Sequence, residues 1–160
     1  MSNVLKAILI DDEKDAIDSL SKILTEFIEG VEIIGSAQTI KEGLTLIENT
    51  TFDLLFLDVN MRKDTGFDLL EKAGPIPANI IFVTAFDHYA IKAFKYSASD
   101  YLMKPVDIQE LRSTIKRIRR SNESKHFFTM AKSLSLYVNT MVINTPFFKF
   151  NYELILTFCF

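Results

Sequence analysis

The sequence predicts an α/β fold, a parallel five-stranded sheet with helices on both of its faces. Short apolar segments alternate along the chain with longer segments whose apolar residues recur at helical spacing. Residues 54–57 form a run of four large apolar residues between Asp53 and Asp58, which is typical of a strand buried on both faces. Because crossovers between parallel strands are right-handed, this alternation predicts a doubly wound sheet.

Apolar spacing and capping residues predict the elements of the first half. Val4–Ile10 and Val31–Ser36 are apolar enough to form two strands. Between them, Lys14–Glu29 has its apolar residues on one side of a helix. Thr39 is suited to cap a second helix, which we expect to end near Asn49.

The second half continues the alternation after a strand at Phe52–Asp58. Glycine and proline at residues 74–77 mark a turn between two of its elements. The predicted elements are a polar loop at Asn60–Thr65, a helix at Gly66–Lys72, a strand at Ile80–Thr84, a helix at His88–Tyr96, a strand at Tyr101–Met103 and a helix over residues 108–120.

Composition limits the classes of function. The chain has 160 residues, 48% of them hydrophobic, and a net charge of -3, which fits a globular domain without general affinity for nucleic acid. No glycine-rich phosphate loop follows a predicted strand, so a nucleotide-binding sheet is disfavoured. The single cysteine, Cys159, and the lack of a signal peptide or apolar span favour a cytoplasmic protein with no membrane partner.

A basic cluster near residue 115 has two interpretations, a solvated helix face or a patch that binds nucleic acid. Its members are Arg112, Lys116, Arg117, Arg119 and Arg120.

Polar residues stand at the carboxyl ends of four predicted strands. Asp11 and Asp12 follow the first strand and Asp58 ends the third. Thr84 ends the fourth strand and Lys104 follows the fifth. In a parallel sheet these ends share one edge, where three carboxylates repel one another and a hard cation such as Mg²⁺ relieves the strain. A lysine and a hydroxyl nearby suit a phosphoryl group, and no His or Cys pattern suggests zinc.

Each of these residues also has a plainer interpretation. Asp11 and Asp12 could cap the helix that follows them. Thr84 could be an ordinary strand-end hydroxyl, Tyr101 a core side chain and Lys104 a solvated side chain. Asp58 is harder to explain in this way, because a buried charge without a partner is costly.

Four motifs, in order, resemble those of a bacterial response-regulator receiver domain, over about residues 4–121. They are Ile8–Glu13, Leu57–Met61 with Gly66, Val83–Ala85 and Asp100–Pro105. The resemblance implies a flavodoxin-like (βα)5 fold with strand order 2-1-3-4-5, an order that receivers exemplify. The segment Thr84–Tyr96 looks most like receivers attached to LytTR-type DNA-binding domains.

The resemblance also implies the ligands of the site. Asp58 would be the phosphoacceptor, taking a phosphoryl group from a sensor histidine kinase. Asp12 and Asp58 would bind Mg²⁺ directly, and the backbone carbonyl of Asn60 would be a third ligand. Asp11 would act through a metal-bound water.

The remaining implied roles concern the switch. Lys104, before a cis Pro105, would pair with the phosphoryl group, and Thr84 would move to hydrogen-bond it while Tyr101 swings inward. The face formed by the fourth helix, fifth strand and fifth helix would then dimerise or exchange partners. A receiver is a signalling phosphoacceptor rather than an enzyme. A Mg²⁺-dependent phosphatase is disfavoured because Asn60 and Arg62 supply no carboxylate beside the nucleophile.

Two positions depart from the family pattern. Arg62 stands where a proline is usual, which should loosen the loop beside Asp58, and Ser97 replaces a common glycine.

We expect residues 1–121 to be the receiver and residues 122–160 to be a linker and a short Phe-rich tail. Asn122–His126 fits a linker and Leu134–Ile143 a strand. The tail is either a truncated or frame-shifted remnant of a LytTR-type DNA-binding domain, which we favour, or a small appendage that packs on a partner. A DNA-binding transcriptional regulator would need a working effector domain in this region.

Overall fold

The computed structural model of the protein describes residues 4–62 and 64–124. The chain divides into two compact units, residues 1–118 and 119–160. Residues 119–124, the described part of the second unit, are helical. The strand predicted at Leu134–Ile143 lies outside the described residues.

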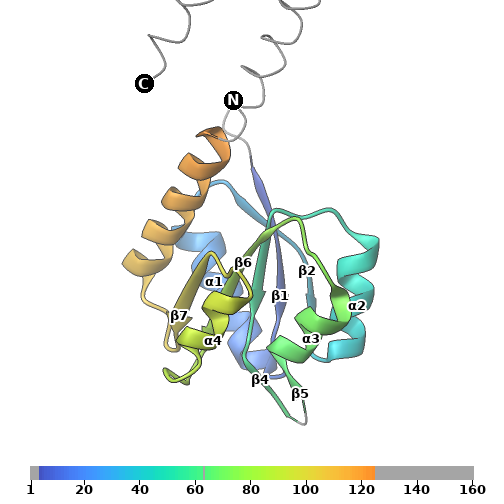
Figure 1. Cartoon of the computed structure of the whole chain (residues 1–160). Helices are drawn as coiled ribbons and strands as arrows, with labels where there is room; N and C mark the ends of the chain where they lie inside the picture. Colours follow the sequence, from blue (N-terminus) through green and yellow to red (C-terminus); the bar gives the residue numbers. More distant parts are fainter. Residues whose placement is uncertain (1–3, 63, 125–160) are drawn as a thin grey trace, which may run out of the picture. The chain divides into compact units, whose positions relative to one another are not determined.

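The first unit is built on five parallel strands (Figure 1). They are β1 (Leu5–Ile10), β2 (Val31–Ala37), β3 (Leu54–Leu57), β6 (Asn79–Thr84) and β7 (Asp100–Met103). Their order across the sheet is β2-β1-β3-β6-β7. Counting these five strands alone gives 2-1-3-4-5, so the predicted flavodoxin-like order is confirmed.

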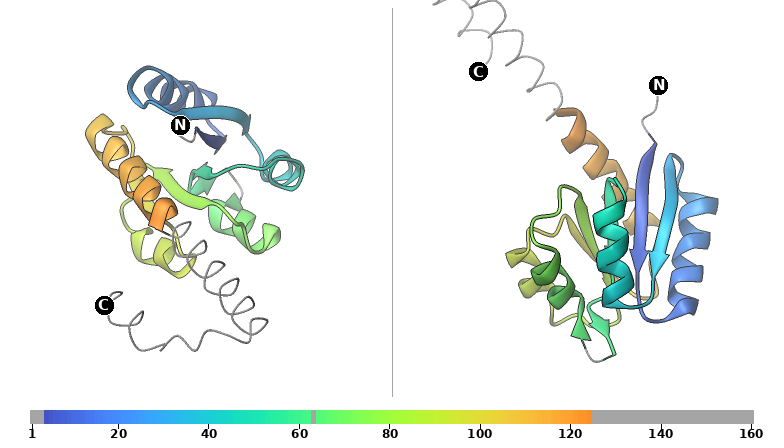
Figure 2. Two further views of the ribbon diagram at one scale, coloured as in Figure 1. Left: turned by 90° about the horizontal axis from the view of Figure 1, so that it is seen from above. Right: turned by 90° about the vertical axis from the view of Figure 1, so that its right-hand side faces the viewer.

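Helices cover both faces of the sheet (Figure 2). They are α1 (Lys14–Phe27), α2 (Ile40–Asn49), α3 (Gly66–Ala73), α4 (Ala90–Lys95) and the helical residues 108–118. One core cluster joins the sheet to α1 and to residues 108–118, and the other joins it to α2, α3 and α4. Successive strand residues enter opposite clusters, as Leu54 and Leu55 do in β3. This two-sided burial explains why β3 is apolar at every position.

Capping residues fix where two of the helices begin. The Thr39 side chain accepts a hydrogen bond from the Glu42 backbone N–H at 3.2 Å, as predicted for the start of α2. At α3, Thr65 and Asp68 form a reciprocal capping box, with the Asp68 carboxylate 2.6 Å from the Thr65 backbone nitrogen. These bonds satisfy amide groups that the first helical turn leaves unpaired.

The predicted polar loop at Asn60–Thr65 is instead a small hairpin. Its strands are β4 (Asn60–Met61) and β5 (Asp64–Thr65), which pair antiparallel. Arg62, at the turn, has φ 52°, and tight hairpins need positive φ at this position. Proline cannot adopt that angle. Arg62 therefore adopts a turn conformation that proline could not, and its loosening of the loop stays a prediction.

Two helix ends also differ from prediction. His88 and Tyr89 form a turn, and α4 begins at Ala90. Both residues have modest helix propensity, and their rings lie 4.2 Å apart at an angle of 41°. The last helix continues to at least Ser124 rather than ending near residue 120. Part of the predicted linker is therefore helical, since residues 121–124 include no helix breaker.

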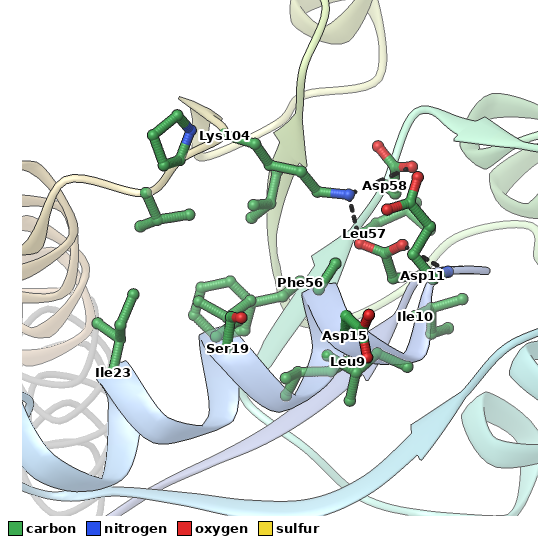
Figure 3. A pocket seen from close by; sticks show the side chains of 17 residues that line it. Leu9, Ile10, Asp11, Asp15, Ser19, Ile23, Phe56, Leu57, Asp58 and Lys104 are labelled. Atoms are coloured by element: carbon green, nitrogen blue, oxygen red, sulfur yellow. Dashed lines mark hydrogen bonds and ion pairs between the residues drawn. The ribbon is translucent and has the colours of Figure 1, made fainter.

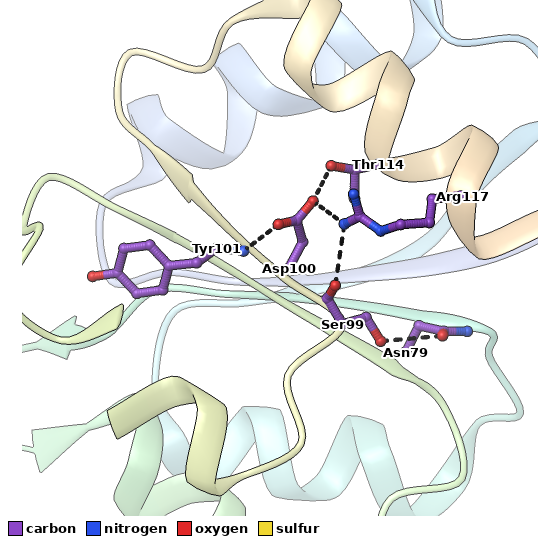
Figure 4. Close-up of polar contacts among 6 residues, drawn as sticks. All are labelled: Asn79, Ser99, Asp100, Tyr101, Thr114 and Arg117. Atoms are coloured by element: carbon purple, nitrogen blue, oxygen red, sulfur yellow. Dashed lines mark hydrogen bonds and ion pairs between the residues drawn. The ribbon is translucent and has the colours of Figure 1, made fainter. Parts of the chain in front are cut away.

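A polar network holds residues 108–118 to the edge of the sheet (Figure 4). The Asp100 carboxylate on β7 accepts hydrogen bonds from the Thr114 hydroxyl and from Arg117, the latter at 2.5 Å. Arg117 also donates to the Ser99 carbonyl at 3.2 Å, and Arg112 donates to the Phe27 carbonyl at 3.1 Å. Two members of the basic cluster are thus engaged in holding the fold together.

None of the described helices is both long and apolar enough to cross a membrane.

Candidate phosphoryl and metal site

The site lies at the carboxyl edge of the sheet, where parallel strands deliver their last residues. Backbone hydrogen bonds continue the strand ladder just past its end. The Asp58 N–H donates to the Ile10 carbonyl at 2.9 Å, and the Lys104 N–H donates to the Thr84 carbonyl at 2.8 Å. The backbone itself therefore fixes where Asp58 and Lys104 leave the sheet.

Three carboxylates meet at this edge, as predicted. One oxygen from each of Asp11, Asp12 and Asp58 lies within 4.8 Å of the other two. Asp11 and Asp58 are buried, and Asp12 is partly buried. Carboxylate oxygens at this spacing are suitable ligands for a hard divalent cation.

Asp58 has an unusual environment for a charged group. Its Oδ1 atom is fully buried and has no hydrogen bond of regular geometry within the described part of the chain. Burial raises the pKa of Asp58, and the charge of Asp11 adds to this effect, while Lys104 opposes it. A cation beside Oδ1 would satisfy the unpaired atom, so the residues fit a bound Mg²⁺.

Lys104 lies between two of the carboxylates (Figure 3). Its Nζ atom is 2.7 Å from Asp11 Oδ2 and 3.6 Å from Asp58 Oδ2, and its side chain is only 21% exposed. Burial favours a lower pKa for Lys104, but the hydrogen bond to Asp11 and the charge of Asp58 outweigh burial and raise it. The peptide bond to Pro105 is cis, as predicted. The interpretation of Lys104 as a solvated side chain is wrong.

Thr84 and Tyr101 occupy different positions relative to Asp58. Thr84 Oγ1 is buried without a regular hydrogen-bond partner among the described residues, yet it lies close enough to oppose weakly the rise in the Asp58 pKa. The Tyr101 hydroxyl donates to the backbone carbonyl of Phe86 on the loop after β6. Burial and the charge of Asp87 raise the pKa of Tyr101. Tyr101 is half-buried and is not a simple core residue.

The helix-capping interpretation of Asp11 and Asp12 is wrong. Glu13 is the N-cap of α1, and no side chain caps that helix. Asp11 Oδ1 accepts a hydrogen bond from the Glu13 N–H at 3.0 Å, which orients the Asp11 carboxylate within the turn. The role of the Asn60 backbone carbonyl as a metal ligand stays a prediction.

The geometry can be compared with known proteins. The response regulator receiver domain family matches residues 7–116 of the chain. The chain belongs to this family. A CheY-like response regulator receiver domain from Methanospirillum hungatei has a solved structure with a TM-score of 0.66 and 30% identity, covering 76% of this chain and 99% of that one.

Among curated relatives, an uncharacterized response regulatory protein of Vibrio cholerae is 39% identical over 125 residues, 78% of this chain and 52% of the relative. The sensory transduction protein LytR of Staphylococcus haemolyticus is 35% identical over 138 residues, 82% of this chain and 54% of the relative. The chain thus contains the receiver domain of a two-component response regulator and spans about half the length of these relatives.

Two residues of the receiver site were not assigned roles from the sequence. Arg62 Nε lies 3.5 Å from Asp12 Oδ2, so a second cation reaches the acidic cluster. Gly66 donates its N–H to the Val59 carbonyl at 2.8 Å, and a Cβ atom there would collide with the Asp58 backbone carbonyl. The sequence offered two signals for them. Arg62 stands where the family usually has proline, and Gly66 belongs to the motif that includes Leu57–Met61.

A half-open cavity of about 310 Å³ adjoins the receiver site (Figure 3). Asp11, Asp58 and Lys104 line one end of it, and apolar residues of α1 such as Ile17 and Leu20 line another part. Asp58 is therefore reachable from outside the sheet edge through this cavity, although its carboxylate is buried.

Proposed function

We propose that this receiver accepts a phosphoryl group on Asp58 from a sensor histidine kinase, with Mg²⁺ held by Asp11, Asp12, Asp58 and the Asn60 backbone carbonyl. The observation that carries the proposal is the buried Asp58 Oδ1, which has no hydrogen bond of regular geometry among the described residues, beside two further carboxylates and a lysine. Such an arrangement is strained without a cation, and buried unpaired polar atoms concentrate at functional sites. Bound Mg²⁺ supplies positive charge that neutralises phosphoryl oxygens.

The residues of the chain divide the chemical work between them. An Asp58 carboxylate oxygen attacks phosphorus, the bond from phosphorus to the kinase histidine nitrogen breaks, and the imidazole leaves with that electron pair. Lys104, already 3.6 Å from Asp58, pairs with a phosphoryl oxygen and compensates the added negative charge. The unpaired Thr84 hydroxyl gains an acceptor in the phosphoryl group. Asp11 holds Lys104 in position through the 2.7 Å contact.

The output is a change of the face formed by α4, β7 and residues 108–118. Tyr101 lies on β7, and its hydroxyl is tied to Phe86 just beyond Thr84. Movement of Thr84 toward the phosphoryl group displaces this loop and releases Tyr101 to turn inward. We propose that the altered face forms a homodimer or binds a partner.

The test is incubation of the full chain with acetyl phosphate and Mg²⁺, followed by intact-protein mass spectrometry. We expect a gain of one phosphoryl group on the wild type, no gain on Asp58→Asn and a strongly reduced rate on Lys104→Met. Removal of Mg²⁺ with EDTA should abolish the gain in mass. No gain on a folded wild type, or an undiminished gain on Asp58→Asn, would refute the proposal.

For the rest of the chain we propose that residues 122–160 are a linker and a Phe-rich tail left by a truncated or frame-shifted LytTR-type DNA-binding domain. The abrupt change in composition supports this proposal, because residues 122–160 hold seven of the fourteen phenylalanines of the chain and no glycine. Translation of all frames of the gene beyond codon 115 tests it, because a β-rich domain of about a hundred residues should appear in another frame. A working DNA-binding regulator is the alternative, and salt-sensitive binding to a defined promoter by the purified chain would establish it.

A further inference from the structure

Arg62 places a positive charge next to the acidic cluster. Its Nε atom is 3.5 Å from Asp12 Oδ2, and the Asp12 side chain is only 15% exposed. The hairpin of β4 and β5 holds the backbone of Arg62 in a left-handed conformation beside the site, with φ 52°. The turn therefore fixes the backbone position from which the Arg62 side chain reaches Asp12.

Each carboxylate of the cluster has a cationic partner. Lys104 contacts Asp11 and Asp58, and Arg62 contacts Asp12. Three negative and two positive groups leave a formal charge of -1 for the five side chains together. Without Arg62 the same cluster would have a charge of -2 and would attract a divalent cation more strongly.

We propose that Arg62 acts as an internal competitor for a divalent cation at Asp12, and so lowers the metal affinity of the unphosphorylated receiver. The inference rests on the proposed function, because it takes Asp12 as a ligand of Mg²⁺. Arg62 contacts Asp12 Oδ2, and a cation bound to the Asp12 carboxylate would displace or repel the nearby guanidinium. The loop after Asp58 thereby sets how much Mg²⁺ the receiver needs.

The distances allow an estimate of the effect. A cation about 2.1 Å from Asp12 Oδ2 would lie at most about 6 Å from the Arg62 guanidinium, given the 3.5 Å contact. The repulsion between a single and a double charge at that distance in water, reduced by screening at about 0.1 M salt, corresponds to roughly a three- to tenfold change in affinity. The Arg62 side chain is 74% exposed, so the solvent value is the appropriate one.

A plainer interpretation is that the Arg62–Asp12 pair is an exposed ion pair without consequence. Such pairs contribute little to stability. The affinity for a metal nevertheless depends on the electrostatic potential at the Asp12 oxygen. It does not depend on how much the Arg62–Asp12 ion pair contributes to folding stability. The two interpretations therefore predict different Mg²⁺ affinities for a variant without the charge.

Calorimetric titration of the full chain with MgCl₂ measures the affinity directly and needs no phosphorylation. Arg62→Gln removes the charge, and Gln carries the same left-handed backbone cost as Arg. Arg62→Lys retains the charge. Lys6→Gln is the matched control, because Lys6 is exposed near the start of β1, about 16 Å from Asp11 at 3.3 Å per strand residue.

We expect Arg62→Gln to bind Mg²⁺ three- to tenfold more tightly than wild type at about 0.1 M salt, and the difference to shrink toward twofold at about 0.5 M. Arg62→Lys and Lys6→Gln should stay within twofold of wild type. Equal or weaker binding by Arg62→Gln would overturn the inference and leave the proposed function intact. A folded wild type that binds no Mg²⁺ would overturn both, and the separate acetyl phosphate assay would then show whether Asp58 is a phosphoacceptor at all.

Discussion

Substitution of Gly66 tests how tightly the start of α3 packs against the end of β3 and Asp58. A Cβ atom at this position would lie 2.9 Å from the Leu57 Cγ atom and closer still to the backbone carbonyl oxygen of Asp58, whereas real Cβ atoms essentially never approach within 3.0 Å. The oxygen belongs to the main chain, so no side-chain rotation can relieve the contact. Gly66→Ala therefore forces the start of α3 away from the end of β3.

We expect Gly66→Ala to lower the free energy of unfolding, whereas the same substitution within a helix usually raises it. Within a helix, Gly→Ala normally stabilises by about 0.5–1 kcal/mol. Overpacking costs about 1–3 kcal/mol, and we expect the clash to outweigh the gain and leave a net loss of about 1–2 kcal/mol. For a domain of about 120 residues, this lowers Tm by roughly 3–10 °C.

Thermal and urea denaturation followed by circular dichroism, in EDTA, provides the measurement. Gly35→Ala is the matched control, because the three atoms nearest to its new Cβ all belong to the Leu46 side chain, the closest at 2.8 Å, and this side chain can rotate away. We expect Gly35→Ala to lose less stability than Gly66→Ala. A Gly66→Ala protein as stable as wild type, or more stable than Gly35→Ala, would refute the packing argument.

Three further predictions concern buried charge, capping and the helix anchor. Burial raises the pKa of Asp58 above its ordinary 3.8, so the cost of its charge is absent at low pH and complete above the folded-state pKa. Asp58→Asn should therefore raise the urea midpoint at pH 7 in EDTA, with a gain that disappears as the pH falls toward 4; an equal gain at both pH values would contradict this reasoning. Thr65→Ala removes the capping box with Asp68 and should cost about 1 kcal/mol in urea denaturation, whereas an unchanged midpoint would show that the cap contributes nothing. Asp100→Ala leaves Arg117 without its carboxylate partner and should raise hydrogen exchange in residues 108–118 more than in α1, and a uniform change would count against a local anchor.

Much of the site was predictable because the chain folds by local rules. A buried strand ends where its apolar run ends, so the run before Asp58 indicated both the strand and the exit point of the carboxylate. The same reasoning placed Asp11 and Lys104 at the ends of their strands, and parallel pairing then brought them together. The family motifs supplied the assignments of role, which spacing alone left open.

Loops and helix ends were less predictable, because their conformation depends on contacts distant in sequence. The hairpin at residues 60–65 requires a left-handed Arg62, which no local pattern of apolar residues reveals. In the turn before α4, the Tyr89 ring contacts His88 and also lies 6.0 Å from the Phe67 ring on α3, a contact between residues distant in sequence.

The sequence by itself determined the order of strands and helices, the two-sided burial of β3 and the set of polar residues at the sheet edge, because periodicity and residue type are local properties. Only the tertiary structure decided which groups are in contact. It paired Lys104 with Asp11 more closely than with Asp58, left Asp58 Oδ1 without a hydrogen bond of regular geometry in the described chain, and brought Arg62 to Asp12. Contact distances and burial depend on all the surrounding elements at once, and these quantities set the pKa of Asp58 and the charge that a metal would meet.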